Sequence, residues 1–360
     1  MPPLILGGGP AGSAAAIALA EMGIAATILE RTREPGDALC GGFLSWRTLA
    51  ALERLGLPAD MLNPRATLRL RLFAGDHVAE AALPGPARAV SRRRLDALLL
   101  ARAGEVGASV ERGVAVRTLD GGTARLADGG EVTGDTILLA TGKHELRGAA
   151  RDARDTNDPM IGLRARLKPT PAIGDAIELH LFDRGYAGLV VQEDGRANLC
   201  LAVARSRLQM AGDPPALLAA LARENPALAT RLDGLEPGAG IDAIANVPYG
   251  WRATSTVPAL YRLGDQAAVI PSLAGEGMGI ALVSGKMAAR AVARGIDARL
   301  FQTRLAHHAA RPLAIAGAIA AIARRPSGAR AIVRLSRAPW LVRAAAHLTR
   351  INQSGVDGGA

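Results

Sequence analysis

The pattern of apolar and polar positions in the first thirty residues predicts a strand, a helix and a second strand. A short apolar run at residues 4–6 is followed by Gly7, Gly9 and Gly12, and then by an alanine-rich segment with helical spacing. A second apolar run follows and ends at Glu30. This order of strand, glycines, helix and terminal acid is the one that a dinucleotide-binding βαβ unit requires.

Each glycine has a physical role in such a unit. Gly7 permits the tight turn out of the strand, Gly9 lets the backbone approach a pyrophosphate, and Gly12 lets the helix pack close to the sheet. The N-terminus of the helix then faces the phosphates with free N–H groups and a partial positive charge. Glu30 stands at the end of the second strand, where its carboxylate can accept hydrogen bonds from a ribose diol.

Strand patterns continue in two groups further along the chain. The strand-like segments before residue 145 are residues 67–73, 77–82, 108–118, 123–133 and 135–142. Within residues 161–204 four more strand-like stretches follow one another, and Asp194-Gly195 marks a hairpin turn. We expect this second group to form an antiparallel sheet on the substrate side, and residues 240–247 to return as a strand.

Helical spacing connects the strands and fills the end of the chain. Ser45 and Ser91 stand at N-cap positions before two helices, and residues 214–232 carry a further helical pattern. From residue 297 to residue 350 the pattern is helical again. Because proline disrupts a helix, we expect this segment to be broken at its three prolines, Pro312, Pro326 and Pro339.

Composition describes a soluble globular protein. Apolar residues make up 49% and charged residues 21% of the 360 residues, a length sufficient for two domains. Cys40 and Cys200 are far apart without metal-ligand spacing, so neither a disulfide framework nor a metal site is predicted. The N-terminus lacks a basic region, and the longest apolar run, residues 313–323, is shorter than the roughly 20 residues that span a bilayer. We therefore expect a cytoplasmic protein.

The net charge of +10 is concentrated near the C-terminus, since residues 301–350 contain nine arginines and no aspartate or glutamate. Ile, Val, Leu and Trp lie between these arginines. One interpretation is an amphipathic basic helix that lies on anionic lipid, peripheral to the inner face of a membrane. The other is an ordinary helix whose arginines are solvated or paired. No nucleic-acid-binding motif accompanies the charge, so no nucleic acid is expected as a partner.

Two further motifs lie far from the first one in the sequence. In SRRRLDALLLARA, Arg92 precedes Leu95-Asp96 at the start of a helix. In RLGDQAAVIPSLAGEGMGIALVSG, a strand delivers Gly264-Asp265, Pro271 follows, and three glycines lead into a helix. With the opening βαβ unit, these motifs resemble the FAD-dependent group that contains geranylgeranyl reductases and aromatic hydroxylases (class A flavoprotein monooxygenases).

The resemblance implies FAD as the cofactor. In that group the Asp of the GD motif binds the ribitol, the Pro and glycines after it line the isoalloxazine, and the Arg before the L-D pair lies near the ribose and phosphates. A helix N-terminus near residues 277–278 would also place partial positive charge beside the N1–C2=O edge of the flavin. The expected FAD-binding residues are Gly7, Gly9, Pro10, Ala11, Gly12, Glu30, Arg31, Cys40, Gly41, Gly42, Arg92, Ala140, Thr141, Gly142, Gly264, Asp265, Pro271, Gly275, Gly277, Met278 and Gly279.

The implied fold is α/β. It has a Rossmann-type FAD-binding domain with an inserted antiparallel β-sheet domain on the substrate side, and a helical C-terminal cap. The expected boundaries are 1–65, 88–155 and 245–297 for the discontinuous FAD-binding domain, 66–87 and 156–244 for the substrate-side domain, and 298–360 for the basic helical segment.

Some residues are candidates for contact with the reacting groups. CGGFLS at residues 40–45 resembles a stretch of the geranylgeranyl reductase branch that runs past the flavin. Cys40 is thus a candidate to touch the isoalloxazine or the substrate, with packing beside a Gly-Gly turn as the alternative. Cys200, inside a strand pattern, is expected in the core. Tyr249 and Trp251 resemble in position an element that shapes the substrate cavity of isoprenoid reductases, although both rings also suit a core.

One departure from the group concerns the electron donor. Aromatic hydroxylases usually carry an A-D-G-x-x-S-x-x-R segment associated with FAD and NAD(P)H, but here the same place reads ATGKHELRGAAR. Gly142 keeps the turn and Arg147 is a candidate for the later Arg, whereas the Asp is absent. NAD(P)H therefore stands as an external reductant without a dedicated site, and a separate electron-transfer partner is the alternative. His144 is a candidate for proton transfer, with a surface-loop histidine as the other interpretation.

The resemblance implies an FAD-dependent oxidoreductase that acts on a hydrophobic or phenolic small molecule. Monooxygenation, in which reduced flavin reacts with oxygen in a closed pocket, is the leading expectation. The runner-up is hydride transfer to or from a C–C bond of a lipid or polyketide substrate, as in isoprenoid reductases. A third hypothesis, from another class, is a non-catalytic lipid-binding protein that retains FAD for structure.

Overall fold

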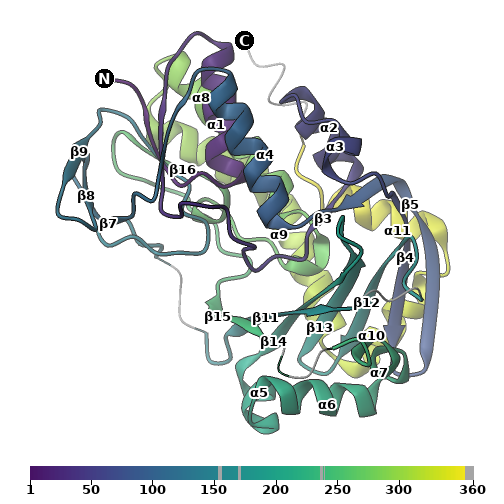
Figure 1. Ribbon diagram of the computed structural model, residues 1–360. Helices are drawn as coiled ribbons and strands as arrows, with labels where there is room; N and C mark the ends of the chain where they lie inside the picture. The colour runs from purple at the N-terminus through teal and green to yellow at the C-terminus, as the bar shows by residue number, and fades with distance from the viewer. Residues whose placement is uncertain (153–155, 169–171, 236–237, 239, 353–360) are drawn as a thin grey trace.

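The computed structural model describes residues 1–152, 156–168, 172–235, 238 and 240–352 (Figure 1). The expected domain boundary at residue 155 and the last residues of the expected C-terminal segment, 353–360, lie outside the described residues. Two large sheets organise the rest, one parallel and one mainly antiparallel.

The first sheet is the parallel nucleotide-binding sheet that the opening motif predicts. Its strands, in spatial order, are β16 (Leu260–Arg262), β10 (Ile137–Leu139), β1 (Leu4–Leu6), β2 (Thr27–Glu30) and β6 (Ser109–Arg112). All neighbours pair in parallel, with Ile5 opposite both Ile28 and Leu138. These short strands are almost entirely apolar at the centre of the sheet, as expected for a parallel sheet that is covered on both faces. The predicted strand at 135–142 contains β10, and β16 lies beside it at the edge of the sheet.

Three helices pack side by side on this sheet: α1 (Pro10–Glu21), α4 (Arg92–Glu105) and α8 (Gly277–Ala293) (Figure 1). Their close approach depends on glycines. A Cβ at Gly12 would lie 2.0 Å from the Gly7 carbonyl oxygen, and one at Gly285 would lie 2.4 Å from the Ala11 carbonyl oxygen. Ser91 accepts a hydrogen bond from the Arg94 amide and caps α4, as its position predicts.

A small three-stranded antiparallel sheet is attached to the parallel sheet. It consists of β7 (Val116–Asp120), β8 (Thr123–Leu126) and β9 (Glu131–Thr133). The sequence pattern at 108–118 predicted one strand here, and that was wrong. Gly113 has φ +77° and divides the segment, so that β6 joins the parallel sheet and β7 begins the small one.

The second large sheet has eight strands, drawn from two separate parts of the chain. In spatial order they are β15 (Asp242–Val247), β11 (Met160–Leu167), β14 (Ala197–Ala204), β13 (Gly185–Val191), β12 (Ala176–Phe182), β4 (Thr67–Ala74), β5 (His77–Ala89) and β3 (Phe43–Leu44). The four stretches within 161–204 are strands, as predicted. The pairs are antiparallel except β12 with β4, which joins the two parts in parallel.

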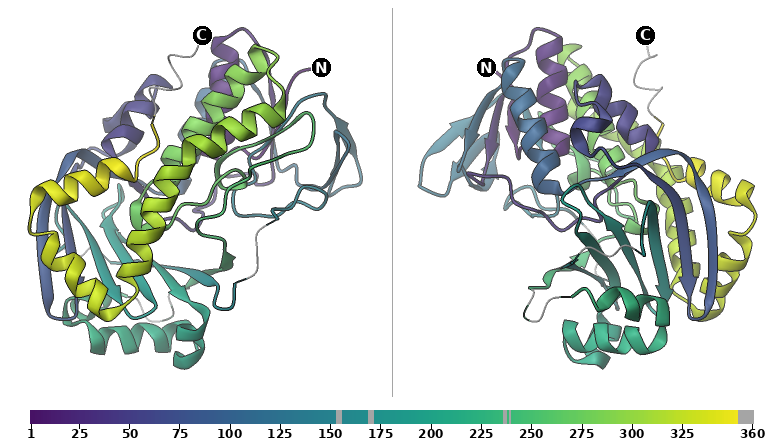
Figure 2. Two further views of the ribbon diagram at one scale, coloured as in Figure 1. Left: turned by 180° about the vertical axis from the view of Figure 1, so that it is seen from behind. Right: turned by 45° about the vertical axis from the view of Figure 1, so that its right-hand side comes forward.

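Helices cover this second sheet on two sides. α5 (Arg205–Ala211), α6 (Pro214–Glu224) and α7 (Pro226–Leu232) bury leucines against β11, β13 and β14. α10 (Pro326–Leu335) and α11 (Pro339–Leu348) pack against β4 and β5, along the outside of the molecule (Figure 2). α2 (Trp46–Arg54), capped by Ser45, and the short α3 (Ala59–Leu62) lie near the junction of the two sheets.

The long helix α9 (Ala298–Ala323) corrects two expectations. Pro312 lies inside it, so the tail is broken at Pro326 and Pro339 but not at Pro312. The apolar run of 313–323 is the last part of this 26-residue helix, which is long and apolar enough to cross a membrane by length and composition alone. Its buried side chains, among them Phe301 and Leu313, pack into the protein core. α9 therefore packs one face against both sheets, and its other face lies at the surface of the molecule (Figure 2).

Candidate active site

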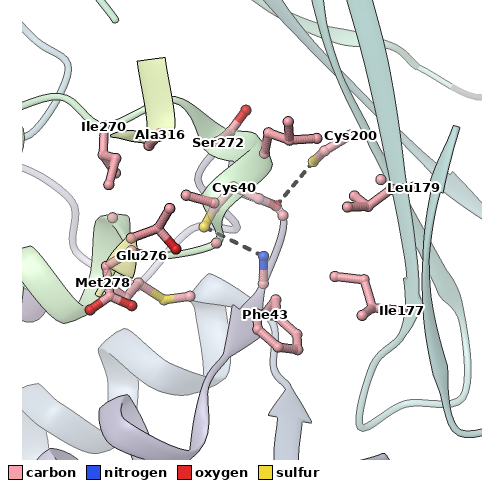
Figure 3. Close-up of a pocket in the computed structure, with 18 of the residues that line it drawn as sticks. Cys40, Phe43, Ile177, Leu179, Cys200, Ile270, Ser272, Glu276, Met278 and Ala316 are labelled. Carbon is pink, nitrogen blue, oxygen red and sulfur yellow. Dashed lines mark hydrogen bonds between the residues drawn. The ribbon is translucent and has the colours of Figure 1, made fainter. Parts of the chain in front are cut away.

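A cavity of about 350 Å³ lies between the two sheets. Its walls come from the β1–α1 turn, the loop before β3, the segment between β16 and α8, strands β4 and β12–β14, and helices α9–α11. It therefore joins the expected flavin site to the inner face of the second sheet. Figure 3 shows Cys40, Ser272 and Glu276 on one side of it, and Ile177 and Leu179 on the other.

The β1–α1 turn has the free donors that a pyrophosphate needs. Gly7 has φ +106°, and a Cβ there would lie 2.6 Å from the Ala140 carbonyl oxygen, so the turn admits only glycine. Gly9 is the N-cap of α1 and has no side chain to use the helix N–H groups. The first hydrogen bond of the helix runs from the Ser13 N–H to the Gly9 carbonyl at 3.0 Å, which leaves the amide of Ala11 outside the helical pattern.

Glu30 is held in place by its own surroundings. Its Oε2 accepts a hydrogen bond from the Gly8 N–H at 2.8 Å, and its Oε1 accepts from the Thr32 N–H and hydroxyl at 2.9 and 2.7 Å. A carboxylate has about four lone-pair sites, so these contacts leave capacity for a ribose hydroxyl. The neighbouring Arg31 lies 2.6 Å from the His144 Nε2.

Arg92 forms a buried pair within α4. Its guanidinium donates two hydrogen bonds to the Asp96 carboxylate, at 2.8 and 2.7 Å. Burial disfavours the charge of Arg92, but the Asp96 carboxylate outweighs this effect and raises the pKa of Arg92. A Cβ at Gly9 would lie 3.3 Å from the Arg92 Nη2, so the fixed positive charge stands beside the pyrophosphate turn.

Lys143 and Asp265 join the two ends of the expected flavin site. The Lys143 Nζ lies 3.1 Å from the Asp265 carboxylate, and that carboxylate raises the pKa of Lys143. Both residues line the cavity. Lys143 belongs to the ATGK segment in which the Asp of the hydroxylase pattern is absent, so a cation occupies this region instead.

The loop between η2 (Ser272–Ala274) and α8 brings backbone into the cavity. Gly275 has φ +61°, and a Cβ there would lie 2.9 Å from the Phe43 ring. α8 begins at Gly277 without a side-chain cap, so its N-terminal amides face the cavity beside Met278. Together with the β1–α1 turn, this second bare helix N-terminus fits a flavin nucleotide with its pyrophosphate at one end and its ring at the other.

A buried ion pair ties this loop to the end of the chain. The Arg350 Nε and the Glu276 Oε2 lie 3.1 Å apart, without the alignment of a hydrogen bond, and the Ile351 N–H donates to Glu276 Oε1 at 3.2 Å. Arg350 also donates to the Ala274 carbonyl and lies over the Trp46 ring, 5.5 Å from its centroid. Burial raises the pKa of the fully buried Glu276 to about 7, against the opposing effect of Arg350.

The two cysteines meet at the cavity wall. The Cys200 thiol donates to the Cys40 carbonyl oxygen at 3.1 Å, and the Gly42 N–H donates to the Cys40 sulfur at 3.5 Å (Figure 3). Cys200 therefore lines the cavity, whereas the strand pattern placed it in the core. Burial raises the pKa of Cys200 to about 12, so it is a thiol at neutral pH.

Two tyrosines and a serine form the main polar group facing the substrate side. The Ser272 hydroxyl lies 3.0 Å from both the Tyr186 and the Tyr249 hydroxyls, and the Leu273 N–H donates to Tyr186 at 3.2 Å. Burial raises the pKa of Tyr249 to about 12 and also raises that of Tyr186. Both phenols are therefore protonated at neutral pH.

The rest of the cavity is mainly apolar, with Ser336 and Thr349 as polar members of its lining. From the polar group it continues between the second sheet and helices α9–α11. The side chains that line this apolar part are Leu70, Leu72, Leu83, Ile177, Leu179, Leu181, Ala316, Ile319, Ile332, Val342, Ala345 and Ala346.

The structure brings most of the expected FAD-binding residues to this one cavity. Those that line it are Gly9, Pro10, Ala11, Cys40, Gly41, Gly42, Arg92, Ala140, Gly142, Gly264, Asp265, Gly275, Gly277 and Met278. The expected residues outside its lining are Gly7, Gly12, Glu30, Arg31, Thr141, Pro271 and Gly279. Several of these act through the backbone of a turn or, like Glu30, lie at the edge of the nucleotide-binding turn.

The four residues predicted as candidates for catalysis also divide into two that line the cavity and two that do not. Cys40 and Tyr249 line the cavity, while His144 and Trp251 do not. Trp251 donates from its indole N–H to Asp152 at 3.0 Å and lies under Arg151, so its ring faces away from the expected substrate path. Burial and the neighbouring Arg31 lower the pKa of His144, which contacts that arginine in a loop outside the cavity.

Sequence reasoning missed four residues of the cavity wall: Tyr186, Ser272, Glu276 and Arg350. Ser272 and Glu276 lie within the RLGDQAAVIPSLAGEGMGIALVSG motif, where their polar side chains were the signal that could have identified them. Tyr186 comes from a strand pattern, and Arg350 from the basic tail, and neither has a local signal that connects it with the loop.

Comparisons with known proteins agree with this site. Residues 1–147 match the family model described as FAD binding domain. Menaquinone reductase of Mycolicibacterium smegmatis is 28% identical over 355 residues, which cover 90% of this chain and 84% of that protein. Digeranylgeranylglycerophospholipid reductase 2 of Methanopyrus kandleri is 28% identical over 319 residues, covering 82% and 77%.

Solved structures share the fold. A geranylgeranyl bacteriochlorophyll reductase-like protein from Thermoplasma acidophilum has a TM-score of 0.77 at 19% identity, over 99% of this chain and 94% of that one. A probable FAD-dependent monooxygenase from Pseudomonas aeruginosa has a TM-score of 0.71 at 17% identity, over 92% and 99%. At these identities the likeness concerns the fold alone.

FAD is thus the cofactor that the family model, the bare helix N-termini and the glycine-lined cavity have in common. The chain is therefore an FAD-dependent oxidoreductase that is similar to menaquinone reductase and to digeranylgeranylglycerophospholipid reductase.

Proposed function

We propose that this flavoenzyme is a reductase that adds two hydrogens across a carbon–carbon double bond of a substrate with a long apolar chain. The observation that carries the proposal is the form of the cavity. Its charged side chains other than Arg350 come from the flavin side, and a mainly apolar part, which also includes Ser336 and Thr349, continues between the second sheet and helices α9–α11. A compact phenolic substrate has no use for this apolar continuation, whereas a lipid-like chain fills it.

The named relatives support the same choice. The two curated proteins described above are both called reductases, and each covers most of this chain. The monooxygenase among the structural neighbours shares the fold at 17% identity, which carries no information on the reaction. Hydroxylation of a phenolic molecule, the leading expectation from sequence, becomes the second candidate because an enclosed cavity also suits oxygen chemistry.

Reduction of an alkene requires a hydride at one carbon and a proton at the other. Bound FAD, once reduced by an external donor, supplies the hydride. The residues that would hold it are the amides of the β1–α1 turn, Glu30, Arg92 and Asp265, with the η2–α8 loop beside the ring. These groups fix the plane in which the double bond must lie.

The proton is assigned to the Tyr249–Ser272–Tyr186 group. Both phenols carry their protons at neutral pH, and the Ser272 hydroxyl links them at 3.0 Å on each side. A proton that Tyr249 gives to the substrate carbon is replaced through Ser272 from its neighbour or from water. The apolar walls keep bulk water away from the substrate, so that water does not protonate it in place of Tyr249.

The direct test is to identify the product. The FAD-loaded protein is reduced with dithionite without oxygen and given a polyprenyl compound with a conjugated or allylic double bond. We expect a product heavier by two hydrogens. When the reduction and the reaction are run in D₂O, both added atoms should be deuterium, because dithionite supplies only electrons and both hydrogens come from the solvent. In a parallel reaction with ¹⁸O₂, incorporation of labelled oxygen into a phenolic substrate supports the hydroxylase instead. A protein whose FAD no donor reduces supports the non-catalytic alternative.

Tyr249→Phe tests the proton donor. We expect alkene turnover to fall by roughly 100-fold while FAD stays bound, because the hydroxyl contributes a positioned proton and no cofactor contact. Tyr261→Phe is the matched control, since Tyr261 lies in the core and its hydroxyl donates to the Ile296 carbonyl at 2.6 Å. Equal turnover in Tyr249→Phe and the unmodified protein removes Tyr249 from this role.

A further inference from the structure

We propose that helices α10 and α11 present a docking surface for an anionic lipid bilayer. The surface, called here the basic face, consists of Arg330, Arg334, Leu335, Arg337, Trp340 and Arg343. These side chains are exposed on the outer side of the two helices and at the turn between them, along the edge of the molecule (Figure 2). The proposal rests on the proposed function only where it concerns the position of the substrate.

The charge of the basic face is uncompensated. Residues 301–350 contain no acidic side chain, and Arg330, Arg334, Arg337 and Arg343 form no ion pair with any residue in the described part of the chain. The half-buried and buried arginines of the same segment behave differently. Arg324 donates to the Ala320 carbonyl, and Arg350 pairs with Glu276. The exposed arginines therefore do not serve the fold as ion-pair partners, so the alternative interpretation of this segment that remains is an ordinary helix with solvated arginines.

Apolar side chains stand among these charges. Leu335 ends α10 and Trp340 is the second residue of α11, and their exposed fractions are 59% and 68%. Holding both in water gives up the free energy that their burial would supply, about 1.5–3 kcal/mol for a fully buried large side chain. Arginines around a leucine and a tryptophan match a bilayer interface, where Trp lies at the level of the headgroups and Arg contacts the phosphates.

The opposite face of the same helices lines the cavity. Ile332 of α10 and Val342, Ala345 and Ala346 of α11 face the apolar part of the cavity. Two helices therefore separate the basic face from the apolar wall on which the substrate chain is proposed to lie. A bilayer bound at the basic face would therefore lie close to the apolar wall, on the other side of the same two helices.

An acidic protein or a nucleic acid is a less suitable occupant. One exposed indole offers no series of stacking partners for bases. A protein interface would be expected to present a larger continuous apolar centre than Leu335 and Trp340 alone. The bilayer needs only shallow apolar insertion together with distributed positive charge, which is what the basic face has.

The test uses the full-length, FAD-loaded protein and sedimentation with large vesicles. Vesicles contain phosphatidylcholine alone or phosphatidylcholine with 30% phosphatidylglycerol, on the order of the anionic content of bacterial membranes. We expect binding to the anionic vesicles only, weakened by added salt because the attraction is largely electrostatic. We also expect Trp340 to move to a less polar environment, so that tryptophan emission shifts to shorter wavelength in the unmodified protein and not in Trp340→Phe.

Two triple variants show whether vesicle binding depends on where the arginines lie or only on the net charge of the protein. Arg334→Gln/Arg337→Gln/Arg343→Gln should reduce the partition coefficient on the order of 100-fold, since each arginine near the surface contributes about a factor of five to ten. The matched control removes three exposed arginines elsewhere, Arg223, Arg252 and Arg299, and should bind within about twofold of the unmodified protein.

The apolar part is tested by Leu335→Ser/Trp340→Ser, expected to weaken binding about tenfold. Its control is Met210→Ser, because Met210 on α5 is equally exposed, at 69%, but lies on another side of the second sheet. Absence of vesicle binding by the intact protein overturns the inference, and so does equal loss in the two arginine triples. Binding to heparin or RNA without binding to vesicles also overturns it. None of these readouts depends on turnover. A protein that does not bind vesicles would therefore overturn the docking surface without affecting the proposed alkene reduction, which product identification tests separately.

Discussion

At the scale of single residues, the acidic groups around the expected flavin are oriented by the protein before any ligand binds. Glu30 accepts from Gly8 and Thr32, Asp265 lies beside Lys143, and Glu276 is fixed by Arg350. Such contacts hold a carboxylate in one rotamer, which reduces the entropy that cofactor binding must otherwise remove. The three acids differ in exposure, and their substitutions therefore have different consequences.

Glu30→Gln should weaken FAD binding. The amide keeps the size of the side chain but loses the charge that strengthens a hydrogen bond from a ribose hydroxyl, and such a bond contributes about 1.5–3 kcal/mol. The dissociation constant of FAD should therefore rise roughly 10–100-fold. Ultrafiltration of the flavoprotein over a range of concentrations measures it, with the exposed Glu34→Gln as control. Equal affinity in the two variants would remove Glu30 from the cofactor site.

Glu276 should give the protein a characteristic pH dependence. Burial raises its pKa from 4.5 to about 7, so in this window the folded protein keeps a proton that the unfolded chain has lost. This group's contribution is therefore fully present below pH 4.5 and is lost as the pH rises through 7, by about 3 kcal/mol in total.

The comparison that isolates this effect is with Glu276→Gln, which cannot titrate. The stability of the unmodified protein relative to the variant should fall as the pH rises from 5 to 8, as measured by urea unfolding at each pH. Glu21→Gln, at the exposed end of α1, should show a constant difference over the same range. A constant or rising difference for Glu276→Gln would mean that the carboxyl is already ionised at pH 5.

At the scale of elements, the contact between α1 and α8 positions both helix N-termini at the cavity. Gly285→Ala would put a methyl group 2.4 Å from the Ala11 carbonyl oxygen and force the helices apart. We expect a loss of about 1–3 kcal/mol in the free energy of unfolding, as for other overpacked sites. Gly104→Ala, in α4 with no atom within 4 Å of the new carbon, should instead stabilise by up to about 1 kcal/mol. Equal urea midpoints for the two variants would show that the helix contact is not tight.

Local sequence patterns predicted most of the helices and strands. They failed where tertiary contacts, which a local pattern does not contain, decide the structure. Strong alternation located β4, β5 and the four strands from β11 to β14, and the serine caps located α2 and α4. The pattern failed at Gly113, where one apolar segment serves two sheets, and at Pro312, where packing keeps a helix continuous through a proline. Tertiary contacts decide both cases, and a local window of sequence does not contain them.

The site divides in the same way. Its nucleotide half is coded in short glycine motifs whose backbone role is local, and these motifs could be recognised. Its substrate half depends on residues distant in sequence, such as Tyr186 with Ser272 and Glu276 with Arg350, which are 86 and 74 positions apart. The spacing of such pairs reflects how the second sheet and the C-terminal helices fold over the loop, and no motif carries that information.

At the scale of the whole molecule, one cavity connects the parallel sheet, the second sheet and the C-terminal helices. The parallel sheet supplies the cofactor site, the second sheet supplies an apolar wall, and α9–α11 close the other side. α9 packs against elements of both sheets, so the cap cannot move without disturbing the cofactor loop. The account therefore predicts that chemistry at the flavin depends on how well a long chain fills the distant wall.

The most direct test is anaerobic stopped-flow absorbance of the reduced, FAD-loaded protein mixed with alkenes of increasing chain length. We expect the oxidised flavin spectrum to return without oxygen. A long polyprenyl alkene should act at least about tenfold faster than its short-chain analogue, since remote binding energy contributes to the reaction. The contradictory result is a flavin that no alkene reoxidises anaerobically, but that oxygen reoxidises while a phenolic substrate gains a hydroxyl group.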